Sequence, residues 1–109
     1  MKTLDLNIEL NEAEKKIDSG KTEVELCIQT IKNVILIHGN QQKGMPEEDR
    51  RLYYKICDVF EKVITDKVVS VELEDTYAGF IKKCFKEVKL TPDSLLRKVE
   101  EKIEGIPQR

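Results

Sequence analysis

Apolar and polar residues alternate along two segments of the chain. In the first, Leu4–Leu10, every second residue is apolar and the residues between are polar. In the second, Val68–Leu73, the apolar positions of the alternation are Val69, Val71 and Leu73. A period of two places these side chains on one face of an extended chain. Each segment is therefore predicted to be a strand with one buried and one solvated face.

A first helix is predicted to follow Thr22. Thr22 and Glu25 have the spacing of a capping box, in which each side chain bonds the other residue's backbone N–H group. Apolar residues then recur at helical spacing up to Ile37. Gly39 is predicted to cap this helix in the left-handed conformation, and Asn40–Met45 to form a loop.

Three further helices are predicted from their start and stop signals. One opens at Pro46, which three acidic residues follow at the positive end of the helix dipole. The next covers Asp75–Val88 behind the acids Glu74 and Asp75, with apolar residues at unbroken helical spacing. The last is predicted to be capped by Thr91, with Pro92 in its first position.

The resulting order is β-α-α-β-α-α. The polar segment Asn11–Lys21 is either a turn or a short hairpin that returns through Lys16–Asp18. We predict an α+β fold, in which a small two- or three-stranded sheet is packed on one side by four helices. A chain of 109 residues is expected to form a single domain, residues 1–109, since domains commonly contain about 100–150 residues.

A sheet of two strands leaves unpaired edges and is marginally stable on its own. Completing the sheet across a two-fold axis would remove these edges. We therefore predict a homodimer, with Leu4–Leu10 as a candidate interface.

Composition argues against several classes of protein. The 19 basic and 21 acidic residues give a net charge of −2, without the basic excess that nucleic-acid binding requires. No apolar run approaches the roughly 18 residues of a membrane span. The odd number of cysteines, without CxxC spacing, argues against a disulfide framework or a zinc cluster. A cytoplasmic location is expected.

No catalytic constellation accompanies the predicted fold. Cys27, Cys57 and Cys84 lie in apolar helical stripes, where thiols act as small hydrophobes. His38 is expected at a helix end, where it interacts with the dipole, and it has no acidic partner nearby in sequence. We expect no enzyme, no metal and no cofactor, with a small cysteine or carboxylate enzyme as an alternative. The paired carboxylates occupy helix starts or a solvated face: Glu47-Glu48, Glu74-Asp75 and Glu100-Glu101.

Four lysines form a charged cluster with helical geometry. Their spacing puts Lys82, Lys86 and Lys89 on one helix face, with Lys83 alongside. Such a stripe attracts acidic partners, and it is also a common solvated face near a helix C-terminus. These four lysines are the predicted partner-binding residues.

The last two predicted helices also permit a DNA-binding helix-turn-helix, the second alternative. Three acidic residues later in the final helix would meet the phosphates, which argues against it, as does the near-neutral net charge. The residues that would point toward the groove are Asp93, Ser94, Arg97 and Lys98.

At Val69–Val88 the chain resembles a known group of proteins. A strand ending in paired acids leads to a helix of the form acidic-x-aromatic-x-x-aromatic-Ile-Lys and then to a short final helix. With Gln42-Lys43-Gly44 ahead of Leu52–Ile64, this order resembles small uncharacterised proteins of tailed phages and prophages of Gram-positive bacteria. The chain departs from them at the inserted Met45-Pro46 and at the longer polar stretch Asn11–Lys21. The resemblance implies no established activity and no site residues.

We therefore expect a non-enzymatic protein-binding accessory factor of a phage or another mobile element. Its expected partners are a protein, acidic where it meets the four lysines, and a second copy of the chain. Neither nucleic acid nor a membrane is expected as a partner. If a phage encodes the protein, its location would be the host cytoplasm.

Overall fold

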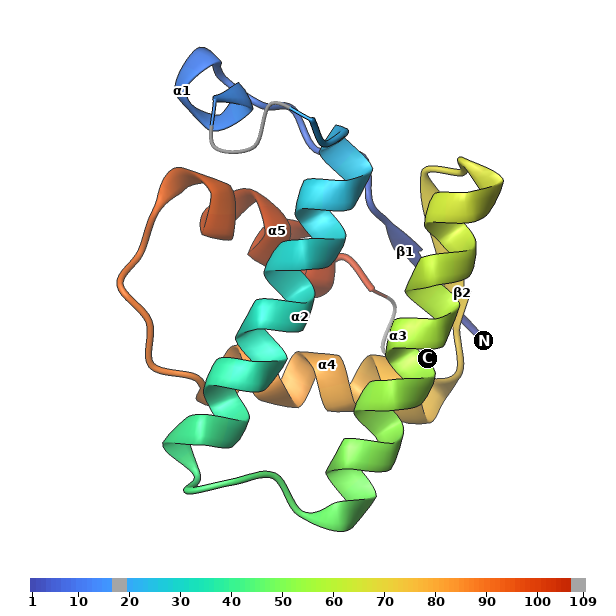
Figure 1. Ribbon diagram of the computed structural model, residues 1–109, viewed down its shortest axis with the longest axis vertical. Helices are drawn as coiled ribbons and strands as arrows, with labels where there is room; N and C mark the ends of the chain where they lie inside the picture. Colours follow the sequence, from blue (N-terminus) through green and yellow to red (C-terminus); the bar gives the residue numbers. More distant parts are fainter. Residues whose placement is uncertain (17–19, 107–109) are drawn as a thin grey trace.

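The computed structural model describes residues 1–16 and 20–106. It confirms the α+β class and the predicted order of two strands and four long helices, to which a helix of four residues, α1, is added (Figure 1). The elements are β1 (Lys2–Asp5), α1 (Glu12–Lys15), α2 (Glu23–Gln41), α3 (Glu47–Asp66), β2 (Ser70–Leu73), α4 (Asp75–Glu87) and α5 (Ser94–Glu104).

The sheet consists of β1 and β2 in antiparallel pairing. Leu4 lies opposite Val71, and the backbone N–H of Leu6 donates to the carbonyl of Val69 at 2.8 Å, just beyond the end of β1. Both strands bury every second residue. The sheet therefore has one apolar face and one face exposed to solvent, as the alternation predicts.

The predicted strands are longer than the observed ones. Leu6 and Ile8 stay buried past the end of β1, so the alternating burial continues without a strand partner. Val69, predicted on the buried face, is 53% exposed. That prediction is wrong because the regular pleat of β2 begins only at Ser70.

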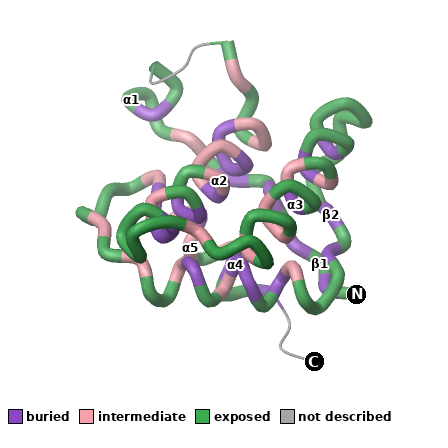
Figure 2. Tube along the Cα trace, turned by 60° about the horizontal axis from the view of Figure 1, so that its bottom comes forward, coloured by how far each residue is buried: buried purple, intermediate pink, exposed green. Residues whose placement is uncertain are grey.

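The helices pack over the apolar face of the sheet. Helices α3 and α4 contact β2, α5 contacts β1, and α2 crosses them with contacts to α3, α4 and α5. Buried positions alternate with exposed ones along the helices (Figure 2). Each strand and each long helix contributes a fully buried side chain to one core: Leu4, Ile35, Phe60, Leu73, Ile81 and Val99.

Helix α2 starts at the predicted cap but ends later than predicted. The Thr22 hydroxyl accepts from the Glu25 backbone N–H at 3.2 Å and donates to the Glu25 carboxylate at 3.4 Å. Gly39 is not the C-terminal cap, because the helix continues through Gln41. The left-handed conformation falls instead on the loop, where Gly44 has a φ of 117°.

Gly39 has a packing role instead. A Cβ atom there would lie 3.1 Å from Cε of Met45, which folds back from the loop onto the helix. The absence of a side chain therefore lets the loop pack against the end of α2.

The cap of α5 also differs from the prediction. Thr91 and Pro92 are not helical; the helix begins at Ser94. Asp93 is the N-cap, and its carboxylate accepts from the backbone N–H of Leu96 at 2.7 Å. The prediction from Thr91 is wrong because Asp93, two residues later, supplies the capping oxygen.

The polar segment after β1 contains a capped helix, α1. The Asn11 side chain accepts from the Glu14 backbone N–H at 2.8 Å, and the Glu14 carboxylate accepts from the Asn11 backbone N–H at 2.9 Å. Of the hairpin return predicted through Lys16–Asp18, only Lys16 belongs to the described residues, and it ends α1. No third strand is present in residues 1–16 or 20–106.

The Glu14 carboxylate joins α1 to α5. It is buried, it accepts from the Ser94 hydroxyl at 2.8 Å, and it pairs with the Lys98 ammonium group. The backbone N–H of Asn11, and next the Lys98 ammonium, lower the pKa of Glu14 to about 2. A second ion pair joins α5 to β1, since Lys102 donates to Asp5 at 2.9 Å.

We predict that Glu14 makes the fold sensitive to acid. Because its pKa falls from 4.5 to about 2 on folding, it stabilises the native state above the unfolded value, and this stabilisation is lost as the pH falls toward 2. Glu14→Gln should lower the free energy of unfolding at neutral pH by about 1–3 kcal/mol. It should also reduce the loss of stability between about pH 5 and pH 2, measured by urea unfolding.

Glu12→Gln is the control, because Glu12 lies on the same helix and is exposed. It should keep both the stability and the acid sensitivity of the original chain. An unchanged acid sensitivity in Glu14→Gln would show that other carboxylates control the transition.

Candidate functional site

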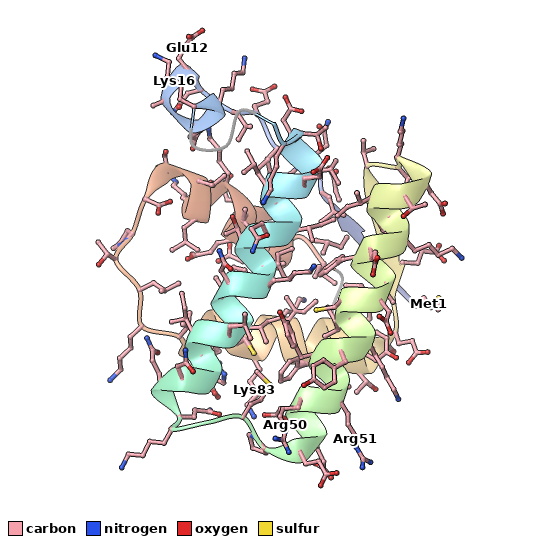
Figure 3. All side chains as sticks on the ribbon, in the orientation of Figure 1. Met1, Glu12, Lys16, Arg50, Arg51 and Lys83 are labelled. Atoms are coloured by element: carbon pink, nitrogen blue, oxygen red, sulfur yellow. The ribbon has the colours of Figure 1, made fainter. Side chains whose placement is uncertain are left out.

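The four predicted lysines do not share one surface. Lys82 and Lys86 line a groove between α4 and α5. Lys83 does not line this groove; in the view of Figure 3 it lies below α4, and its electrostatic effect on Cys84 opposes that of Asp49 of α3. The fourth, Lys89, follows the end of α4 and is therefore not on that helix.

The lysines of the groove differ in how they are engaged. Lys82 is half-buried and donates to the backbone carbonyl of Ile106 at 2.6 Å, so it fixes the end of the described chain. Lys86 is exposed and makes no ion pair within residues 1–16 and 20–106. Lys86 is therefore the lysine of this groove that is available to a partner.

The groove consists of two adjoining hollows of about 720 Å³ and 400 Å³. Both are lined by Phe85 of α4 and Glu100 of α5, so they form one continuous depression between the two helices. Its apolar lining comes from α4, from the connection to α5 and from α5 itself: Phe85, Val88, Leu90, Pro92, Leu96 and Ile103.

The two walls of the smaller hollow carry opposite charges. The α4 wall has Lys82 and Lys86, and the α5 wall has Glu100 and Glu104. Neither glutamate forms an ion pair within the described part of the chain. In the larger hollow, a basic and an acidic side chain both come from α5. Arg97 and Glu101 form an ion pair there at 3.5 Å and are largely exposed.

The connection between α4 and α5 is fastened at both ends. The Gln41 side chain accepts from the Lys89 backbone N–H at 2.9 Å and donates to the Lys89 carbonyl at 2.6 Å. The other end is held by the Asp93 cap. Between these points the chain passes around the outside of the molecule, and Leu90 and Pro92 line one end of the groove (Figure 1).

The same arrangement bears on the helix-turn-helix interpretation. Of its four proposed DNA-contacting residues, Asp93 caps α5, while Ser94 and Lys98 bond to Glu14. Arg97 pairs with Glu101 of the same helix. These engagements give DNA little to contact, and they do not favour this alternative.

His38 has an acidic partner that sequence proximity could not reveal. It is buried, and its Nε2 lies 3.0 Å from Oε1 of Glu87 on α4 and 3.2 Å from the Gln42 amide nitrogen. When Nε2 carries a proton and donates it to Glu87, this nitrogen has no lone pair left to accept a hydrogen bond from the Gln42 amide.

These residues line a hollow of about 240 Å³ with Gln41 and Lys89, and no Ser, Thr or Cys of the described chain lines it. The contact between His38 and Glu87 therefore connects the end of α2 to α4.

The cysteines are largely core residues, as predicted. Cys27 and Cys84 are buried, and burial raises the pKa of each thiol to about 12. Cys57 is half-buried. Burial, and next a hydrogen bond with Cys57, raise the pKa of Tyr53 to about 12. The thiols of Cys27 and Cys84 are therefore not activated for nucleophilic attack, which requires a lowered pKa.

We predict that a thiol reagent at about pH 8 distinguishes these cysteines. In the folded protein Cys57 should react first, while Cys27 and Cys84 react only as fast as the protein unfolds. Cys57→Ser should remove the rapid phase of the reaction, and unfolding in urea should expose the remaining thiols. The reaction is followed by the absorbance of the chromophore that the reagent releases. A rapid reaction at Cys84 in the folded protein would support a thiol enzyme.

Neither a metal-ion cluster nor a membrane-spanning helix is present among the described residues. In residues 1–16 and 20–106, no group of three or more His, Cys, Asp or Glu side chains is arranged to hold a metal ion. None of the helices in this part of the chain combines the length and the apolar character needed to cross a membrane.

Comparison with known proteins adds no relative. No family model matches the chain, and neither a curated protein nor a solved structure matches it.

Proposed function

We propose that the chain is a non-enzymatic protein-binding domain and that its binding surface is the groove between α4 and α5. The observation that carries this proposal is the groove itself, an apolar lining between charged walls. Protein interfaces have this anatomy, with an apolar centre and a polar rim. Small-molecule sites are lined mainly by apolar groups, with only a few polar ones.

Lys86 is the proposed contact for an acidic group of the partner. It is exposed, lies on the α4 wall and has no ion-pair partner in the described chain. Lys82 supports the same wall, although its ammonium group already binds the carbonyl of Ile106. Lys83 and Lys89 lie outside the α4–α5 groove and are not part of the proposed surface.

The biological setting is proposed from the sequence resemblance described above. We propose an accessory factor of a phage or another mobile element that acts in the host cytoplasm. Phage genes beside the encoding gene would support this setting, and a neighbourhood of housekeeping genes would contradict it.

We predict that a photo-reactive amino acid at Pro92 or Lys86 cross-links a host or phage protein in cells. The same group at Glu61, exposed on α3 and outside the groove, should not give this product. The cross-linked protein, identified by mass spectrometry and purified, should then bind the unmodified domain.

In this purified pair, Lys86→Glu should weaken binding at least about fivefold, because it replaces an attraction by a repulsion. Lys83→Glu is the matched control, with the same change of charge on the same helix but outside the groove. Equal effects of the two substitutions would contradict the proposed surface.

The homodimer is a separate prediction. Leu6, within the candidate interface Leu4–Leu10, is fully buried within one chain, so a lysine there would unfold the protein rather than report on an interface. Static light scattering at micromolar concentration should give twice the chain mass of 12.6 kDa. A mass of one chain at every concentration would contradict the dimer.

A further inference from the structure

We infer that the groove between α4 and α5 takes an amphipathic helix with acidic residues on one flank and basic residues on the other. This inference rests on the proposed function and specifies the chemistry of the partner. It follows from three features of the groove: the nature of its walls, its length and the distribution of its charges.

The walls favour a helical partner over an extended one. Along α4 and α5 the backbone N–H and C=O groups are mostly paired within each helix, and only the connection at one end of the groove is not helical. An extended peptide over this lining would find few backbone partners and would leave its own polar groups unpaired. A helix pairs its backbone groups internally and needs to offer only an apolar stripe.

The length of the groove sets the length of this stripe. Helix α5 has 11 residues, and at about 1.5 Å per residue it spans roughly 16 Å. A partner helix of about three turns matches this length. Its apolar residues would recur at i, i+3 or i+4, and i+7 to contact the half-buried lining residues Phe85, Val88 and Leu90.

The charges of the walls determine the flanks. Lys86 on α4 faces a groove whose other wall carries Glu100 and Glu104, and none of the three has an ion-pair partner in the described chain. A partner that is acidic on both flanks would be repelled by α5, and one that is basic on both flanks by α4. A helix with one flank of each sign complements both walls.

Three synthetic peptides of about 14 residues test this inference. They share one apolar stripe of leucines and differ only in their flanks, which are acidic and basic, acidic on both sides, or basic on both sides. Fluorescence anisotropy of the labelled peptides should show that the mixed peptide binds at least about fivefold more tightly than either of the others.

The double variant Glu100→Lys/Glu104→Lys should move the preference to the peptide with two acidic flanks, since both walls of the smaller hollow are then basic. Glu12→Lys/Glu61→Lys is the control, with the same change of net charge at exposed positions outside the groove. If the half-buried Glu100 position does not accept lysine, Glu104→Lys alone should shift the preference in the same direction.

Each result decides a different statement. Equal binding of the three peptides, or no binding of the mixed peptide, overturns the inference about the partner. The proposed function then still stands if cross-linking at Pro92 and Lys86 identifies a protein whose binding Lys86→Glu weakens. If neither the cross-linking nor the peptide binding succeeds, the proposed function and the inference about the partner are both overturned.

Discussion

The structure depends on covering the apolar face of two very short strands. Each strand has four residues, and a two-stranded sheet is marginal by itself. Leu4 and Leu73 are fully buried because helices close over them: α3 and α4 contact β2, and α5 contacts β1. The sheet thereby sets the positions of α4 and α5, and the groove lies where these two helices meet.

Polar interactions then fix α5 in place. Lys98 reaches the buried carboxylate of Glu14, and Lys102, one turn later, reaches Asp5. Both acids belong to the N-terminal part of the chain, so two helical turns of α5 are bound to segments far away in sequence. Glu100 and Glu104 of the same helix are not used in these ion pairs, and they form the acidic wall of the smaller hollow.

The sequence allowed local elements to be predicted better than the site. Hydrophobic periodicity and caps such as Thr22 depend on neighbouring residues, and they located both strands and the four long helices. Asn11 and Glu14 have capping-box spacing, but the segment Asn11–Lys21 contains too few apolar residues for hydrophobic periodicity to indicate a helix there. Two features of the site depend on how α4 packs against other helices, which no local pattern encodes. One is the pairing of His38 with Glu87, and the other is that Lys82 and Lys86 line the groove while Lys83 and Lys89 do not.

The pairing of β1 with β2 has a consequence for synthesis of the chain. Strand β1 precedes β2 in the chain and leaves the ribosome earlier, yet Leu4 can meet Val71 only after α2 and α3 have been made. Until then Leu4, Leu6 and Ile8 form an alternating apolar segment without a cover, the kind of segment that pairs with strands of other chains. The strand that is made earlier is thus paired late, and the polar residues between its apolar positions oppose association with other chains during that interval.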